Sequence, residues 1–325
     1  MAGRFVFGAA FLVYALTASA AIGWLDSPEF VASAADLGIA HAPGHPLPAL
    51  LGRLAGLVPI GDLALRVSLM SGLLTAAAAW ALYVAARAVL CRAWPDIAPR
   101  TSEVIASATA IVFALSYAVW SQAVRAEVYG LQALLSVATL AAVIAYDRRR
   151  QPRWLLTAGL LGGLSLANHH LIALTVLVPA AMFVVLRRRA DRPRATLLSL
   201  TAVAGIVGLA ALLYLPVRAS RHPEVNWGAP DTAERFAWMV SARAFQKSVG
   251  GERPTGAGED SALIGVALIG NAGVPVVALA LIGLYAGLRR RDRRGVWLLL
   301  GGVVVLGVGA RALVGFEPNT PDHHA

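Results

Sequence analysis

Residues 5–24 read FVFGAAFLVYALTASAAIGW and carry no charge, and residues 26–46 after them read DSPEFVASAADLGIAHAPGHP. An apolar run of about 20 residues is long enough to cross a bilayer as a helix. The whole chain of 325 residues is 58% hydrophobic and 14% charged, whereas a soluble chain is about a quarter charged. We therefore expect an all-α, polytopic integral membrane protein in which Asp26, Glu29 and two histidines follow the first span.

The apolar blocks of the sequence predict nine transmembrane helices. They lie at about 5–24, 63–90, 103–120, 128–146, 154–168, 170–186, 195–216, 261–288 and 296–315. The block at 154–168 is short for a span, and residues 47–58 are shorter still, which favours an interfacial or re-entrant helix there. GLLGGL at 159–164 favours close packing of one helix against another. A single transmembrane domain over residues 1–325 is expected, and a chain cut short at its C-terminus fits the same pattern.

Charge follows the predicted spans. The net charge is +10, but the basic residues sit between apolar blocks, which indicates topology and contact with anionic membrane lipids instead of nucleic acid. With the N-terminus inside, the basic clusters fall on alternate, cytoplasmic loops. Thirteen of the 18 acidic residues then face outside. We expect a bacterial cytoplasmic membrane, an N-terminus in the cytoplasm and an active site that faces outside.

Two long outer loops follow from this topology, at 25–62 and 217–260. The second contains an amphipathic pattern over about 232–245. The first span has another interpretation, because Arg4, a short apolar core and Ala18-Ser19-Ala20 resemble a secretory signal with its cleavage site. Residue 26 emerges on the outer side in either case. The single cysteine, Cys91, excludes an internal disulfide.

Asp26 and Glu29 fit a helix start, with Asp26 as N-cap and Pro28 in the first turn. A carboxylate held there can also act as a general base toward a hydroxyl. His41 and His45 follow in AHAPGHPLP, whose prolines exclude a regular helix. His169 and His170 are expected on the same side. No cofactor is assigned. A divalent metal fits these side chains, and so do hydrogen bonding at the interface and contact with a sugar or phosphate.

Charged residues also lie at the outer ends of other spans. Arg125, Glu127 and Tyr129 belong to the tight turn WSQAVRAEVYG at 120–130, where the first two either neutralise each other or join the same pocket. Arg218, Arg221 and Arg311 depart from the orientation rule. They either extend to the outer headgroups or hold a phosphate anion, for which arginine is well suited.

Five stretches together resemble a known family. They are DSPEF with AADLGIAHAPGHPLP at 26–48, RVSLMSGLL at 66–74, WSQAVRAEVYGLQALL at 120–135, GLSLANHHL at 163–171 and YLPVRASRHPEVNWGAPDT at 214–232. The resemblance is to a former domain-of-unknown-function family of polytopic glycosyltransferases that includes the transmembrane protein O-mannosyltransferases. It implies a GT-C-like fold, a polyprenyl-phosphate sugar donor, a protein or glycan acceptor and a catalytic carboxylate in the first outer loop.

Residue by residue, the resemblance implies Asp26 as the base, with Glu29 as partner or rival, and inversion at the anomeric carbon. The implied substrate-binding set is His41, His45, Arg125, Glu127, Tyr129, Asn168, His169, His170, Arg218, Arg221, Asn226, Trp227 and Arg311. Within it, Arg218 would hold the lipid phosphate. The family usually has HPPGYP where this chain has HAPGHP at 41–46, and its members are usually longer.

Two other function classes fit a polytopic chain. A transporter or lipid flippase would need ionisable groups near mid-membrane, whereas the charges here gather at the outer ends of the spans. Bound polyprenyl phosphate without sugar transfer would favour it. A non-catalytic scaffold of envelope assembly would keep its function when the carboxylates are lost.

Overall fold

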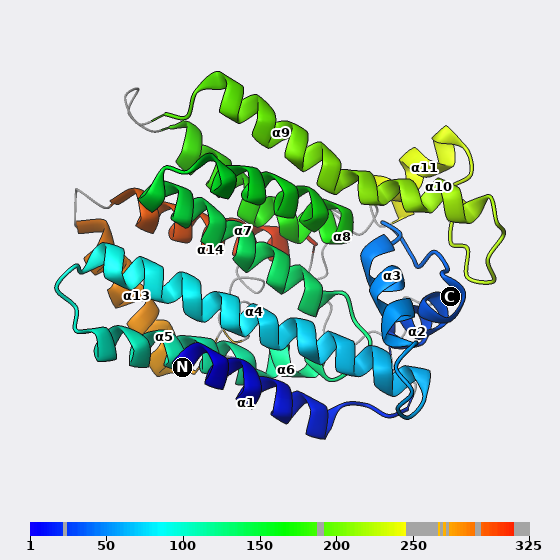
Figure 1. Cartoon of the computed structure of the whole chain (residues 1–325), viewed down its shortest axis with the longest axis horizontal. Helices are drawn as coiled ribbons and strands as arrows, with labels where there is room; N and C mark the ends of the chain where they lie inside the picture. The colour runs from blue at the N-terminus through cyan, green and yellow to red at the C-terminus, as the bar shows by residue number, and fades with distance from the viewer. Residues whose placement is uncertain are drawn as a thin grey trace.

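The computed structural model describes residues 1–21, 25–186, 192–244, 266, 269–270, 273–289 and 294–314. Within these ranges the chain is helical, without a strand, as the sequence predicts (Figure 1). In the described residues, one isolated parallel β-bridge joins Ile39 and Asn226. The fold class is therefore all-α.

Four of the described helices are long and apolar enough to cross a membrane. They are α4 (Leu63–Ala93), α7 (Tyr129–Arg149), α8 (Pro152–Val185) and the run Ala195–Ala219, which comprises α9 (Ala195–Leu209), η2 (Ala210–Leu213) and α10 (Tyr214–Ala219). Three apolar helices are shorter: α1 (Ala2–Thr17), α13 (Val274–Arg289) and α14 (Arg294–Val314), which is apolar over Gly295–Val308. These helices make the chain an integral membrane protein, but the nine predicted spans are not confirmed.

The predicted span at 103–120 is broken in the structure. It forms α5 (Pro99–Leu115) and α6 (Tyr117–Ala123), which are bent by 64° relative to each other and count as a fifth span only if they are taken together. The break is at Ser116, whose backbone is extended and whose hydroxyl donates to the Phe113 carbonyl oxygen at 2.8 Å. This hydrogen bond satisfies a carbonyl that the helix end leaves unpaired.

α8 folds back on itself at His169, where φ is −156° and ψ is 92°. A Cβ placed on Gly162 would lie 2.8 Å from Leu177 Cδ2, although 15 residues of continuous helix would separate them by about 22 Å. The two arms match the predicted segments 154–168 and 170–186, each shorter than a full span. The first arm then packs parallel to α9, with Gly159 against Thr201 and Gly163 against Gly205. The close packing predicted for GLLGGL is confirmed.

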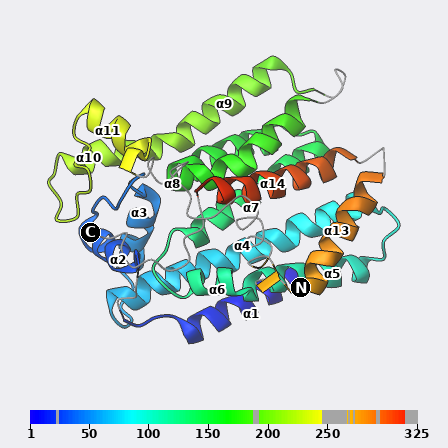
Figure 2. The same ribbon diagram turned by 180° about the vertical axis from the view of Figure 1, so that it is seen from behind.

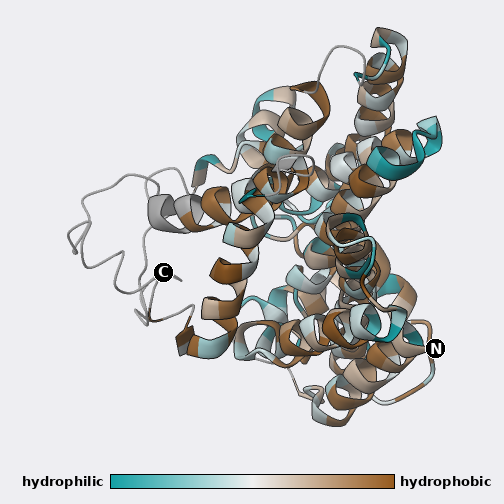
Figure 3. Cartoon of the chain, turned by 90° about the vertical axis from the view of Figure 1, so that its left-hand side faces the viewer, coloured by the Kyte–Doolittle hydropathy of each residue, from teal (hydrophilic) through white to brown (hydrophobic). Residues whose placement is uncertain are grey.

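α1 packs into the bundle against α4 and α5. Val6 and Tyr14 are buried, and the Tyr14 hydroxyl donates to the Ala114 carbonyl oxygen at 2.7 Å. This packing makes α1 part of the described bundle. Seen from behind, α14 lies beside α8 (Figure 2). Large apolar side chains such as Leu16, Ile206 and Leu213 are exposed, and hydrophobic residues cover much of the helices (Figure 3), as a lipid-facing surface requires.

The loops separate to opposite ends of the bundle. α2 (Ser27–Asp36), α3 (Pro46–Ala55), α10 and α11 (Ala233–Val240) gather at one end (Figure 1). At the other end, Arg92 pairs with Asp147 at 3.6 Å and joins two of the predicted cytoplasmic loops, and Arg87 pairs with Glu103 at 3.4 Å across the first of them. The predicted interfacial helix at 47–58 is α3. The amphipathic helix predicted over 232–245 begins with Thr232 as N-cap but ends at Val240, and residues 245–260 lie outside the described part.

Candidate functional site

The two long loops, predicted on the same side, are joined by backbone hydrogen bonds. Ile39 N–H donates to Val225 O at 2.7 Å, and Trp227 N–H donates to Ile39 O at 3.0 Å. Glu224 N–H donates to Asp36 Oδ2 at 2.6 Å. Gly38 permits this approach, because a Cβ there would lie 2.7 Å from the Val225 carbonyl oxygen. The second loop thus holds the first in place beside the ends of the spans.

Asp26 occupies the N-cap position of α2, as predicted, but its side chain makes no capping hydrogen bond. The start of the helix is held instead by Ser27, whose hydroxyl donates to Ala126 O at 3.0 Å. Ala126 belongs to the turn between α6 and α7, so α2 is fixed against the bundle without the Asp26 carboxylate. That carboxylate is half-buried and remains available for chemistry.

Glu29 and His41 form a two-point hydrogen-bonded pair. Backbone N–H of His41 donates to Glu29 Oε1 at 2.7 Å, and Nδ1 of the same residue lies 2.6 Å from Glu29 Oε2. Burial opposes the charged imidazolium, but the hydrogen bond to Glu29 and the negative charges of Glu29, Asp26 and Glu127 outweigh it, so the pKa of His41 is raised.

His45 is the buried counterpart of His41. It starts α3 with φ at 42°, its ring centroid lies 5.0 Å from that of His41, and Phe30 packs on both rings. Nδ1 donates to the carbonyl oxygen of Asn168 at 2.8 Å. Burial, with the charges of His41 and His169, holds the pKa of His45 well below its usual range. A neutral ring that donates from Nδ1 carries its lone pair on Nε2, so His45 offers an acceptor.

Arg125 and Glu127 form the ion pair that their spacing allows, and both are buried. Arg125 Nε lies 3.2 Å from Glu127 Oε1, and Arg125 also donates to Gln122 Oε1 at 2.9 Å. Burial raises the pKa of Glu127 to about 7, against the opposing charges of Arg125 and His41 and with the help of Asp26. Glu127 Oε2 is buried without a hydrogen-bond partner among the described residues.

Asn168 joins the cluster through a buried polar network. Its Nδ2 donates to Val128 O at 3.3 Å and to Gln132 Oε1 at 3.1 Å, and Gln132 Nε2 donates to the Ser165 and Ser136 hydroxyls. Sequence reasoning missed Gln132, Ser136 and Ser165. Their signal is the spacing of polar side chains within apolar helices: Gln132 and Ser136 are four residues apart, and Ser165 and Asn168 are three apart, which places each pair on one helix face.

The remaining predicted aromatic and histidine residues lie at the bend of α8. The His169 ring is 6.3 Å from His45, 5.9 Å from Tyr129 and 6.4 Å from His170, centroid to centroid. Because α8 reverses direction at His169, both histidines reach the end of the bundle that carries α2 and α3. The fold thus brings together Asp26, Glu29, His41, His45, Arg125, Glu127, Tyr129, Asn168, His169 and His170, which we call the carboxylate–histidine cluster.

Other predicted residues lie apart from this cluster. Arg218 donates from Nε to Leu37 O and from Nη2 to Asp36 O, both at 2.8 Å. It therefore caps the C-terminal end of α2, about 15 Å along the helix from Asp26. Its role as phosphate ligand stays a prediction that this position does not favour. Arg221 is exposed, Asn226 forms the bridge to Ile39, and Trp227 stacks on Trp238 at 5.9 Å. The side chain of Arg311 lies outside the described residues.

Asp26, Glu29 and His41 each offer one ligand atom, and these atoms lie within 4.8 Å of one another. Two carboxylates and an imidazole suit a divalent cation. The Glu29–His41 hydrogen bond satisfies two of the three groups without an ion, so both interpretations made from the sequence stay open.

Comparison with known proteins finds a matching family model and a curated relative. The family model described as Protein O-mannosyl-transferase TMEM260 N-terminal domain matches residues 26–194. The Protein O-mannosyl-transferase TMEM260 of Mus musculus is 30% identical over 239 residues, which are 71% of this chain and 32% of the mouse protein. The chain thus spans about a third of that relative's length. No solved structure matches. The range matched by the family model contains every residue of the carboxylate–histidine cluster, whereas Arg218 and Arg221 lie beyond it.

Proposed function

The chain belongs to the protein O-mannosyl-transferase TMEM260 family, and from this premise we propose that it is a membrane glycosyltransferase. It would move a sugar from a polyprenyl-phosphate donor to a hydroxyl of a protein or glycan acceptor on the extracytoplasmic side. The observation that carries the proposal is the carboxylate–histidine cluster at one end of an apolar helical bundle. Lipid-linked donors present their sugar at such an end, because the prenyl chain stays in the bilayer.

Asp26 is the proposed base. It accepts the proton of the acceptor hydroxyl as that oxygen forms a bond to the anomeric carbon, and the bond from this carbon to the donor phosphate breaks. Attack from the face opposite the phosphate inverts the anomeric configuration. The absence of a capping hydrogen bond on Asp26 supports this role, since its oxygens are not committed to the helix.

The Glu29–His41 pair is proposed to stabilise the negative charge of the leaving phosphate. The raised pKa of His41 favours an imidazolium held by Glu29, and its positive charge would lie beside the negative charge of the phosphate. Negative charge that grows on the phosphate in the transition state would thereby be stabilised where it develops. Neutral His45 and the His169 ring would line the sugar, to which they offer hydrogen bonds and an apolar face.

Substitution of the base tests the proposal. Asp26→Asn should lower transfer of sugar from a polyprenyl-phosphate donor by about 100-fold or more, because general-base catalysis contributes about 10²–10⁴-fold. Glu224→Gln is the matched control, since Glu224 is exposed at the same end of the bundle and should keep wild-type activity. The measurement is the rate of product formation with purified protein, with thermal unfolding recorded for both variants.

Full activity of a folded Asp26→Asn variant would exclude Asp26 as the base. Glu29→Gln would then show whether the neighbouring carboxylate is the base instead. If neither substitution reduced transfer, the non-catalytic scaffold would be favoured over the enzyme.

A further inference from the structure

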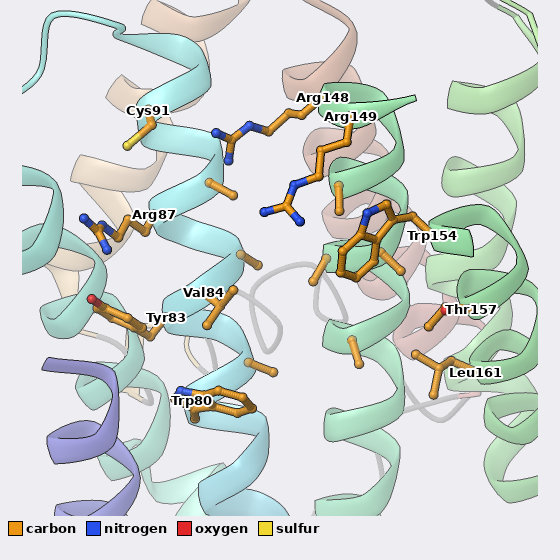
Figure 4. A pocket seen from close by; sticks show the side chains of 17 residues that line it. Trp80, Tyr83, Val84, Arg87, Cys91, Arg148, Arg149, Trp154, Thr157 and Leu161 are labelled. Carbon is orange, nitrogen blue, oxygen red and sulfur yellow. The ribbon is translucent and has the colours of Figure 1, made fainter. Parts of the chain in front are cut away.

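A cavity lies toward the opposite end of the bundle from the carboxylate–histidine cluster. It has a volume of about 590 Å³ and lies between α4, α7 and the first arm of α8 (Figure 4). This volume falls within the roughly 300–1,000 Å³ typical of small-molecule sites. The transfer reaction proposed above does not use it.

The walls of this cavity are apolar and mostly small. Two stripes of alanine face it, Ala81, Ala85 and Ala88 on α4 and Ala138, Ala141, Ala142 and Ala145 on α7. Their spacing of three and four residues places each stripe on one helix face. Trp80, Val84 and Leu161 extend the apolar wall, and Tyr83 and Thr157 also line the cavity. A cavity lined mostly by methyl groups between membrane helices suits a hydrocarbon chain better than a hydrated solute.

The mouth of the cavity is strongly basic. Arg87, Arg148 and Arg149 line it, and Figure 4 shows Arg148 and Arg149 extending from α7 toward α4. Arg149 also lies over the Trp154 ring, at 5.3 Å from its centroid. The indole nitrogen of Trp154 is buried without a hydrogen-bond partner among the described residues.

The carboxylates near this mouth do not neutralise Arg148 or Arg149. Glu103 lies 3.4 Å from Arg87. Asp147 lies 3.6 Å from Arg92 and 3.9 Å from Arg150. Arg148 has no ion pair within the described part of the chain, so positive charge remains in excess beside an apolar channel. That combination matches a molecule with an anionic head and a hydrocarbon tail.

We propose that this cavity is a binding site for one anionic phospholipid of the leaflet next to the basic loops. The headgroup phosphate would lie between Arg148 and Arg149, with the Trp154 indole N–H as a further donor, and one acyl chain would follow the alanine stripes. Arginine binds phosphate through several donors at once. Basic pockets between membrane helices on the cytoplasmic side are suited to anionic headgroups.

Native mass spectrometry of the purified protein with phosphatidylglycerol tests this site. The double variant Arg148→Gln/Arg149→Gln should bind phosphatidylglycerol about thirty-fold more weakly, from about 1 kcal/mol for each basic residue near a lipid headgroup. Arg4→Gln/Arg100→Gln is the matched control, because it removes two exposed charges that do not line the cavity, and it should bind like the wild type. Ala141→Phe should also weaken binding by filling the channel while leaving the arginines in place.

Two results would overturn the proposal: unchanged phosphatidylglycerol binding in the double variant, or equally tight binding of phosphatidylcholine by the wild type. Release of the lipid by millimolar inorganic phosphate alone would also overturn it, because the acyl chain would then contribute nothing. If the glutamine variant fails to fold, Arg148→Lys/Arg149→Lys keeps the charge and should retain most of the binding. None of these readouts depends on sugar transfer.

Discussion

At the scale of single residues, burial decides which members of the cluster carry charge. His41 and His45 are four residues apart, yet the pKa of His41 is raised and that of His45 is lowered. The difference arises because His41 has Glu29 as a partner, whereas His45 meets a neutral carbonyl and other imidazoles. One ring is therefore suited to donate and the other to accept.

Glu127 leads to a prediction on pH dependence. Its folded pKa of about 7 lies above its ordinary value of 4.5, so the folded state holds the proton more tightly than the unfolded state. The stability that this group contributes is present in full below pH 4.5 and is lost as the pH rises through 7. The loss has a slope of up to about 1.4 kcal/mol per pH unit.

Glu127→Gln should remove the decline of thermal stability that Glu127 contributes between pH 5 and pH 7.5. Two slopes of opposite sign then remain: the raised pKa of His41 lowers stability as the pH rises above 6.5, and the lowered pKa of His45 raises stability as the pH rises toward 6.5. Thermal unfolding in detergent across this pH range is the measurement. Glu224→Gln, which changes an exposed carboxylate, should decline like the wild type. An unchanged slope in Glu127→Gln would show that Glu127 does not titrate there.

At the scale of elements, the reversal of α8 and its contact with α9 bring His169 and Asn168 to the cluster. Glycine makes this contact possible, since a Cβ on Gly163 would lie 1.9 Å from Gly205 O and one on Gly208 would lie 2.3 Å from Leu160 O. The obstacle is backbone in both cases, which cannot move aside as a flexible side chain can. The two helices must separate if either glycine is replaced.

Gly163→Ala should therefore destabilise the protein by about 1–3 kcal/mol, the usual cost of overpacking. Gly8→Ala, on α1, meets nothing within 4 Å and should be neutral or stabilising by about 0.5–1 kcal/mol, because alanine favours a helix more than glycine does. Thermal unfolding in the same detergent compares the two. Equal stability of both variants would contradict the packing of α8 on α9.

At the scale of the whole molecule, the carboxylate–histidine cluster and the basic loops lie at opposite ends. The expected orientation assigns the basic end to the cytoplasm, because basic loops are retained inside. The single cysteine allows this to be measured, since Cys91→Ala removes the only native thiol. Glu224 and Gln151 are exposed at the two ends and provide matched labelling sites.

In the Cys91→Ala background, Glu224→Cys should react with a membrane-impermeant maleimide in intact cells. Gln151→Cys should react only after the cells are permeabilised. The reverse pattern would place the cluster in the cytoplasm and would remove the proposed access to an extracytoplasmic donor.

The sequence by itself determined the class, the two long loops and most of the cluster. Apolar length is a local property, and an apolar run forms a helix in a membrane because its backbone polar groups must bond within the segment. Charge asymmetry is local too, and the orientation that it indicates stays a prediction. Asp26 at the start of α2, α3 at 46–55 and the division of α8 at His169 were all predicted from local signals. The number of spans was not. Ser116 breaks α5 from α6, α8 takes up two predicted segments, and α1, α13 and the apolar part of α14 are shorter than a full span.

Only the tertiary structure decided which of these residues meet. Arg218 and Asp26 lie in motifs of the same resemblance, yet Arg218 caps the far end of α2. Gln132 and Ser165 also lie in such motifs without a predicted role, and they join Asn168 in a buried network. The tertiary structure also decided the pKa shifts of the cluster, because desolvation and neighbouring charge depend on residues far apart in the chain. Contacts of this range are set by the packing of helices, and packing is a property of the whole bundle.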